Sequence, residues 1–129
     1  PQHYSVIATT NLNGDFISDA LAAQVGGVGM SPGANINFNT GHAVFEPVHG
    51  TAPDIAGENK ANPVGMLLSG AMLFEYIGWQ EASDELRKCL SRLIELRIVT
   101  HDLHGIDGAI LKGTQQYADA FVESLLSFQ

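Results

Sequence analysis

Two aspartates lie four residues apart in the segment NLNGDFISD, and this spacing is suited to a divalent cation. If the segment is helical, the carboxylates of Asp15 and Asp19 project from the same face, one turn apart. Like charges at this spacing repel each other unless a cation lies between them, and two hard oxygen ligands suit Mg²⁺ or Mn²⁺. A solvated helix start is the alternative, because acidic side chains also interact favourably with the N-terminal helix dipole.

The loop EPVHGTAPDIAGENKANP, residues 46–63, is rich in turn-forming residues and has the character of a ligand-binding segment. Its backbone N–H groups and the imidazole of His49 could bind a ligand, and Asp54 could accept hydrogen bonds from sugar hydroxyls. An aspartate that binds a ribose diol also repels a 2′-phosphate, which predicts NAD in preference to NADP. A structural loop ordered by its prolines is the alternative. The glycines of residues 26–33 lack the G-x-G-x-x-G order of a Rossmann fingerprint.

The segment THDLHG places His101 and His104 on either side of Asp102. A histidine beside a carboxylate could act as a general base or hold a metal ion. We interpret this group instead as hydrogen bonding within a loop. Cys89, the only cysteine, is interpreted as a packing residue, and no serine lies in a nucleophile elbow. The sequence therefore offers no catalytic residue of its own.

The composition excludes several classes of function. The 129 residues carry a net charge of −8 and no basic stripe, which argues against binding to a nucleic-acid duplex. A single cysteine rules out an intrachain disulfide and a cysteine zinc cluster. The N-terminus has no signal-peptide pattern, and the longest apolar segment, 64–79, contains Glu75 and is shorter than a membrane span. We therefore expect a soluble protein of the cytoplasm or of the mitochondrial matrix, with no membrane partner.

The elements that would position these residues alternate between strands and helices. The sequence predicts strands at 4–9 and 42–47, helices at 15–25, 63–77, 80–98 and 114–128, and loops at 26–37 and 99–108. Asn13 or Asp15 would cap the first helix, and Asn62 with Pro63 gives the apolar helix at 63–77 a strong start. This order indicates an α/β layer arrangement. Two strands cannot cover these helices, so the sheet is expected to need further strands.

Three segments resemble the β-decarboxylating dehydrogenases, the family of isocitrate, 3-isopropylmalate, homoisocitrate and tartrate dehydrogenases. They are ATTNLNGDFISDALAAQVGGVGMSPGANIN, AVFEPVHGTAPDIAGENKANP and VTHDLHG. The pair NLNGD and PGANIN is most similar to the prokaryotic-type isocitrate dehydrogenases. The resemblance implies an isopropylmalate/isocitrate dehydrogenase-like α/β fold of layered sheet and helices, not a Rossmann fold, with only the C-terminal portion present. Residues 1–25 would end the small metal and dimer domain, and residues 26–129 would form the later half of the large cofactor-binding domain.

The resemblance implies a role for each matching residue. Asp15 and Asp19 match the metal-binding aspartates of the family, with Mg²⁺ or Mn²⁺ as the ion. The positions that match the cofactor site are Glu46, His49, Gly50, Thr51, Ala52, Pro53, Asp54, Ile55, Asn62 and Asp102. NADP-dependent isocitrate dehydrogenases tend to carry Lys-Tyr in place of Asp54-Ile55, and Tyr and Arg in place of His101 and Gly105. The resemblance and the argument from Asp54 therefore agree in predicting NAD.

The implied activity is the NAD-dependent oxidative decarboxylation of isocitrate to 2-oxoglutarate, a step of the tricarboxylic acid cycle, in a homodimer with shared active sites. The substrate-binding and acid–base residues of the family lie upstream of the matched segment, so we expect this chain alone to be inactive. The arginines agree, because Arg87, Arg92 and Arg97 share one predicted segment far from Asp15 and cannot clamp a polyanion there. Two alternatives remain: a homoisocitrate or 3-isopropylmalate dehydrogenase, and a non-catalytic nucleotide-binding or regulatory subunit.

Overall fold

The computed structural model describes residues 3–127, which form four α-helices and two small sheets. The elements in chain order are α1 (Asn11–Val25), η1 (Val28–Met30), β1 (Pro32–Ile36), β2 (Ala43–Pro47), η2 (Pro53–Ile55), α2 (Val64–Tyr76), α3 (Gln80–Glu95), β3 (Ile98–Val99), η3 (His101–Leu103), β4 (Ile110–Leu111) and α4 (Thr114–Leu126). The α/β class predicted from the sequence is confirmed.

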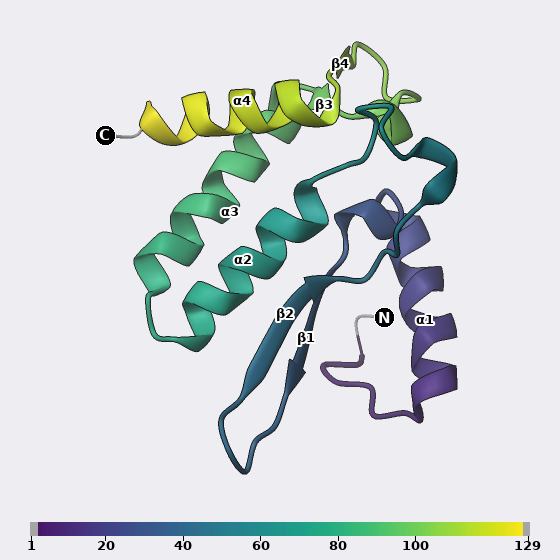
Figure 1. Cartoon of the computed structure of the whole chain (residues 1–129), viewed down its shortest axis with the longest axis vertical. Coiled ribbons are helices and arrows are strands. Elements are labelled where there is room, and N and C mark those ends of the chain that lie inside the picture. Colours follow the sequence, from purple (N-terminus) through teal and green to yellow (C-terminus); the bar gives the residue numbers. More distant parts are fainter. Residues whose placement is uncertain (1–2, 128–129) are drawn as a thin grey trace.

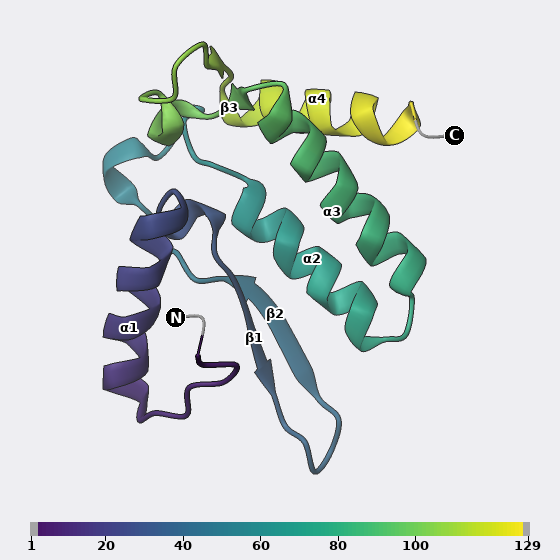
Figure 2. The same ribbon diagram turned by 180° about the vertical axis from the view of Figure 1, so that it is seen from behind.

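The antiparallel hairpin of β1 and β2 lies between α1 and α2 (Figure 1). Its register pairs Pro32 with Pro47 and Ile36 with Ala43. The helix α2 packs against both strands, α3 returns antiparallel beside α2, and α4 crosses the end of α3 (Figures 1 and 2). The strands β3 and β4 are parallel and two residues long, and they connect the end of α3 to the start of α4.

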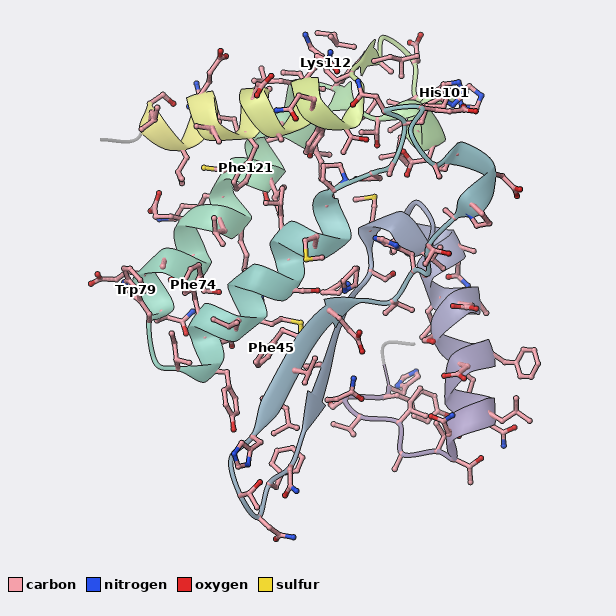
Figure 3. All side chains as sticks on the ribbon, viewed as in Figure 1. Phe45, Phe74, Trp79, His101, Lys112 and Phe121 are labelled. Atoms are coloured by element: carbon pink, nitrogen blue, oxygen red, sulfur yellow. The ribbon has the colours of Figure 1, made fainter. Side chains whose placement is uncertain are left out.

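The hydrophobic core lies between α2, α3 and α4. Its buried members are Val64, Cys89, Leu90, Leu93, Tyr117 and Phe121. Figure 3 shows Phe121 between the ribbons of α4 and α3. Cys89 is 0% exposed, which supports its interpretation as a packing residue, and this burial raises the pKa of its thiol.

The helix α2 begins at Val64, one residue after the predicted start, and its N-cap position is Pro63 instead of Asn62. The Oδ1 atom of Asn62 nevertheless accepts a hydrogen bond from the backbone N–H of Val64 at 2.9 Å, which satisfies one of the free N–H groups of the first turn. One face of α2 is buried at Val64, Gly65, Ser69 and Ala71. Met66 on the opposite side is 56% exposed. The helix is therefore buried on the core and hairpin sides but not all round.

Residues 4–9 form no strand, so this prediction is wrong. The run is exposed, and Val6 has 84% of its surface accessible. No strand among residues 3–127 pairs with it, and a β-branched run without a partner gains nothing from the extended ladder.

The helix α1 begins at Asn11, four residues before the predicted start at Asp15. Asn13 and Asp15 therefore lie inside the helix and do not cap it. The first turn closes when the N–H of Gly14 bonds to the carbonyl of Thr10 at 2.8 Å, and Thr10 makes no side-chain cap.

Two further boundaries differ from the prediction. The segment 26–37, predicted as a loop, contains β1, because pairing with β2 overrides the low strand propensity of Pro32 and Gly33. The helix α3 ends at Glu95 instead of residue 98, because Arg97 adopts a positive φ of 58° and the next residues pair with β4. Within residues 3–127, no helix combines the length and apolar character that a bilayer span requires.

Candidate functional site

A pocket with a volume of about 290 Å³ lies where three separate segments meet: the turn after α1, the loop between β2 and α2, and η3. Its lining residues are Gly26, Gly27, Val28, Gly29, His49, Ala52, Ile55, Lys60, Ala61, Asn62 and Asp102. Five of the predicted cofactor residues are brought together here: His49, Ala52, Ile55, Asn62 and Asp102. Drug-sized ligands occupy pockets of roughly 300–1,000 Å³, so this one suits a group of nucleoside size.

A hydrogen-bond network joins the loop to η3. The Nδ2 atom of Asn62 donates to Oδ2 of Asp102 at 2.9 Å, and the hydroxyl of Thr100 donates to Oδ1 of the same carboxylate at 2.5 Å. Asn62 is 7% exposed and Thr100 is 0% exposed. Both oxygens of Asp102 therefore have protein donors, which fixes the carboxylate at the pocket wall.

The rim of the pocket includes a residue in a strained backbone conformation. Ala52 has φ 43° and ψ 62°, the left-handed region that a residue with a Cβ seldom adopts. Such strain costs on the order of 1–3 kcal/mol and is concentrated at ligand-binding sites. Beside it, Nδ1 of His49 lies 3.0 Å from the carbonyl oxygen of Gly50. Donation through Nδ1 leaves Nε2 of a neutral His49 ring free to accept a hydrogen bond.

The remaining predicted cofactor residues lie outside this pocket. Gly50 and Thr51 line an adjoining hollow that shares part of the same loop. Pro53 and Asp54 belong to the exposed η2 and line neither hollow. Glu46 lies on β2, where its Oε1 atom accepts a hydrogen bond from an asparagine of β1 at 3.1 Å.

Sequence reasoning missed the turn at 26–29, Lys60 and Ala61, which also line the pocket. The glycines do not follow the Rossmann order, and at Gly29 the absence of a side chain instead lets the backbone pack closely against neighbouring side chains. A Cβ on Gly29 would lie 3.1 Å from the Cβ of Asn62 and 3.4 Å from Oδ2 of Asp102. Lys60 brings a positive charge to the wall and pairs with Glu58. The sequence held no signal for Lys60, because it is an isolated lysine in a loop.

Asp15 and Asp19 lie one turn apart on α1, and both are exposed. Within residues 3–127, no group of three or more His, Cys, Asp or Glu side chains is arranged to hold a metal ion. The donor set is thus two hard carboxylates, which fits Mg²⁺ or Mn²⁺ when substrate, water or another chain completes the coordination. From Asp19 to the pocket residue Gly26 the helical rise amounts to roughly 10 Å.

The histidines of THDLHG do not form an acid–base pair with Asp102. The Nδ1 atom of His104 lies 2.8 Å from the carbonyl oxygen of His101, and the two ring centroids are 5.3 Å apart. Both rings are exposed, and Figure 3 shows His101 at the edge of the molecule. This geometry agrees with hydrogen bonding within the loop.

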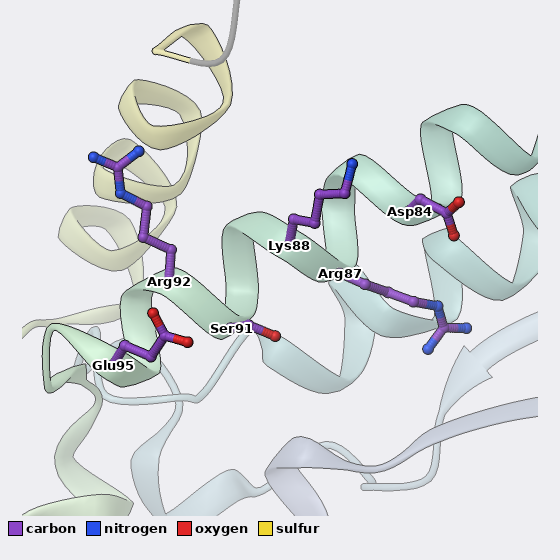
Figure 4. Close-up of a pocket in the computed structure, with 6 residues that line it drawn as sticks. All are labelled: Asp84, Arg87, Lys88, Ser91, Arg92 and Glu95. Atoms are coloured by element: carbon purple, nitrogen blue, oxygen red, sulfur yellow. The ribbon is translucent and has the colours of Figure 1, made fainter.

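A second hollow, on the surface of α3, does not form a converging site. Its lining residues are Asp84, Arg87, Lys88, Ser91, Arg92 and Glu95, and Figure 4 shows their side chains pointing in different directions. Arg87 pairs with Glu75 at 3.3 Å. Lys88 pairs with Glu85 at 2.8 Å, and this hydrogen bond raises the pKa of Lys88. We interpret this face as solvated surface.

Comparisons with known proteins agree with the resemblance. The family model for isocitrate/isopropylmalate dehydrogenase matches residues 1–121. A protein of Streptococcus mutans serotype c named isocitrate dehydrogenase (NADP) is 54% identical over 125 residues, which are 97% of this chain and 32% of the relative. A protein of the same name from Staphylococcus aureus strain Mu50 is 51% identical over 126 residues, covering 97% of this chain and 30% of the relative. The chain therefore spans about a third of the length of these relatives.

A solved structure confirms the predicted fold. The crystal structure of isocitrate dehydrogenase from Methylococcus capsulatus matches with a TM-score of 0.87 and 44% sequence identity. The match covers 97% of this chain and 36% of that chain.

The prediction of NAD as the cofactor is wrong, because the relatives just described are named isocitrate dehydrogenase (NADP). The structure gives the physical reason. The prediction rested on two grounds: repulsion between Asp54 and a 2′-phosphate, and the absence of the Lys-Tyr pair at 54–55 and of Tyr and Arg at His101 and Gly105. The names of the relatives overturn the inference from both grounds. For the first ground, Asp54 lines neither the pocket nor the adjoining hollow. Like-charge repulsion falls with distance and is screened at an exposed position, so this carboxylate does not decide the cofactor.

Proposed function

The chain belongs to the isocitrate/isopropylmalate dehydrogenase family, and from this we propose that it carries the NADP-binding part of an isocitrate dehydrogenase. The reaction is the oxidative decarboxylation of isocitrate to 2-oxoglutarate. The observation that carries the proposal is a nucleoside-sized pocket in a chain 54% identical to a relative of that name. Because the chain spans 32% of that relative, we propose the activity for a complete subunit of this kind. The names of the relatives favour isocitrate over homoisocitrate or 3-isopropylmalate.

The pocket is proposed to hold the adenosine half of NADP. Asn62, Asp102 and the turn at 26–29 line the pocket together, and the turn packs on Asn62 and Asp102 through Gly29. His49 can accept a hydrogen bond through Nε2, since Nδ1 is directed to the backbone. When bound, NADP supplies the acceptor for the hydride that leaves the substrate.

Lys60 is proposed to contact the 2′-phosphate. It is the one lysine or arginine among the residues that line the pocket. Its side chain is 47% exposed and pairs with the exposed Glu58, an ion pair of little net stability that a phosphate can replace. A lysine on a flexible stem can shift to a phosphate at small cost and form a charge-assisted hydrogen bond there.

Asp15 and Asp19 are proposed as ligands of Mg²⁺ or Mn²⁺. Their exposed carboxylates, one turn apart on α1, supply two of the oxygens that either ion needs. The bound ion would polarise the oxygen of the oxidised substrate as a Lewis acid. The chain's own contribution is to hold the two carboxylates on one face of α1, the helix whose C-terminal end leads into the pocket.

A homodimer with shared active sites is also proposed. The surface of α1 supports it, because only Ala22 of its 15 residues is buried. Leu12, Phe16 and Val25 on the same helix are 65%, 70% and 68% exposed. Large apolar side chains gathered on one helix are typical of a protein interface. We place the enzyme in the cytoplasm, in the tricarboxylic acid cycle.

The test is a chimeric subunit, in which this chain replaces the matching segment of the Streptococcus mutans relative. With isocitrate and Mg²⁺ it should reduce NADP, measured by the absorbance of NADPH. A chimeric subunit that is folded by circular dichroism but reduces no NADP with isocitrate would overturn the proposal.

A further inference from the structure

Asn59 connects the loop that lines the pocket to the start of α4. It lies immediately before Lys60, Ala61 and Asn62, the three consecutive residues of the loop that line the pocket. Its backbone has a positive φ of 56°, which asparagine tolerates better than other residues with a Cβ. This conformation turns the loop toward α4, 56 residues further along the chain.

The contact between Asn59 and α4 consists of three hydrogen bonds. The Oδ1 atom of Asn59 accepts from the N–H of Gln115 at 2.9 Å, and its carbonyl accepts from the N–H of Thr114 at 2.9 Å. The Nδ2 atom donates to Oε1 of Gln116 at 2.9 Å. A fourth bond, from the hydroxyl of Thr114 to the carbonyl of Ala61 at 2.6 Å, ties the next part of the loop to the same turn.

These bonds make Asn59 a capping residue for a helix to which it does not belong. The residue at the N-cap position of α4 is Gly113, which has no side chain to satisfy the N–H groups of the first turn. Asn59 supplies the missing acceptors. A Cβ on Gly113 would lie 2.8 Å from the carbonyl oxygen of Asn59, so the glycine leaves the space that the loop occupies.

The helix α4 is a rigid support for the loop. Tyr117 and Phe121 on α4 are 1% and 5% exposed and belong to the hydrophobic core. Because α4 is anchored in the core, its hydrogen bonds to Asn59 hold the pocket wall at 60–62 in a fixed position relative to the core. At the other end of the wall Asn62 is fixed by Asp102, so the segment between them has both ends held.

We infer that Asn59 is a positioning residue for cofactor binding, which holds the pocket segment 60–62 in its binding conformation by capping α4. The inference rests on the proposed function of the pocket. It assigns no contact between Asn59 and the cofactor, because Asn59 lines only the adjoining hollow.

Three substitutions in the chimeric subunit test this inference. Asn59→Gly keeps the positive φ without strain but removes both side-chain bonds, and it should raise the KM for NADP about fivefold to tenfold. Asn59→Asp keeps the acceptor for Gln115 at a helix N-terminus that favours negative charge, and it should stay within about twofold of the parent. Asn39→Gly, in the exposed turn between β1 and β2, is the matched control and should change nothing.

A role in positioning the cofactor pocket should change only the KM for NADP, whereas general damage to the fold should also change kcat and the KM for isocitrate. In Asn59→Gly, the KM for isocitrate and kcat should stay at the parent values while the KM for NADP rises. An unchanged KM for NADP would overturn the inference, and so would equal losses in Asn59→Gly and Asn59→Asp.

Hydrogen exchange gives a second measurement that needs no turnover. In Asn59→Gly the amides of residues 55–62 and of Thr114 and Gln115 should exchange faster than in the parent, and in Asn59→Asp the amide of Gln115 should remain protected. If the parent chimeric subunit fails to reduce NADP, the proposed function fails, and exchange still decides the role of Asn59. Unchanged exchange rates of these amides in Asn59→Gly would overturn the inferred role of Asn59.

Discussion

Substitution of Asn62 by alanine is expected to lower the free energy of unfolding by about 2–5 kcal/mol. The side chain is 7% exposed and makes two hydrogen bonds, to the N–H of Val64 and to the carboxylate of Asp102. Loss of the bond to the first turn of α2 costs about 0.5–2 kcal/mol, as loss of a helix cap does. Loss of a hydrogen bond to a charged group costs about 1.5–3 kcal/mol more. The sum is large against a typical stability of about 5–15 kcal/mol.

Asn62→Asp separates the two contributions. It retains the acceptor for Val64 but places an oxygen where the Nδ2 atom now donates to Oδ2 of Asp102 at 2.9 Å. Near neutral pH the two carboxylates would repel each other, so this variant should lose at least as much stability as Asn62→Ala. Repulsion raises the pKa of the pair in the folded state, and stability should therefore recover as the pH falls and one carboxyl gains a proton.

Urea unfolding of the chain, followed by circular dichroism, measures these differences at neutral pH and near pH 5. Asn35→Ala is the control, because Asn35 is exposed and its amide bonds only to the exposed Glu46. The control should change stability by no more than about 0.5 kcal/mol. A loss below about 1 kcal/mol in Asn62→Ala, or an Asn62→Asp variant as stable as the parent at neutral pH, would refute the reasoning.

Four further substitutions have defined outcomes. Burial, with a smaller effect of Asp102, raises the pKa of Tyr117 to about 12. Because the unfolded chain loses the phenol proton first, the free energy of unfolding should fall by about 2–3 kcal/mol as the pH rises from 10 toward 12, and Tyr117→Phe should remove this dependence. Lys60→Gln in the chimeric subunit should raise the KM for NADP about tenfold, through loss of a charge-assisted contact, and leave catalysis with saturating NADP unchanged. Asp15→Asn and Asp19→Asn should each raise the Mg²⁺ concentration for half-maximal rate at least about tenfold.

Each of these predictions has a control in the same chain. Tyr76→Phe should keep the alkaline dependence that Tyr117→Phe loses, and equal slopes in both would contradict the first prediction. Lys88→Gln on the solvated face of α3 should leave the KM for NADP unchanged, whereas an unchanged KM in Lys60→Gln would count against the assigned phosphate contact. Asp84→Asn is the control for the metal ligands, and an unaltered Mg²⁺ dependence in both α1 variants would contradict that assignment.

The sequence predicted best where a local signal and tertiary packing agree. The Asn-Pro pair marks the start of α2 to within one residue, because Asn62 bonds to the N–H of a near neighbour in its first turn. The strand β1 was missed because its residues gain their stability from pairing with β2, which no local pattern reveals. The run at 4–9 has the composition of a strand, but composition cannot supply a partner, and Val6 and Ile7 remain exposed.

The pocket shows the same division. His49, Asn62 and Asp102 were found from the motifs, and the structure brings them together. The error concerned Asp54, whose chemistry was judged without knowledge of its place: it is exposed on η2 and lines neither the pocket nor the adjoining hollow. Lys60 was overlooked for the converse reason, because an isolated lysine in a loop gives no sign that it lines a pocket.

The proposed metal and cofactor sites lie on differently packed parts of the chain, the exposed helix α1 and a pocket beside the core helices. The core fixes α2, α3 and α4, whereas α1 buries only Ala22 and is held mainly where it enters the turn at 26–29. At that turn Gly29 lies so close to Asn62 and Asp102 that a Cβ would contact both. Gly29 therefore joins the turn that follows α1 to the wall of the pocket. We expect that a displacement of this wall would also shift the turn from which α1, the helix of the proposed metal ligands, extends.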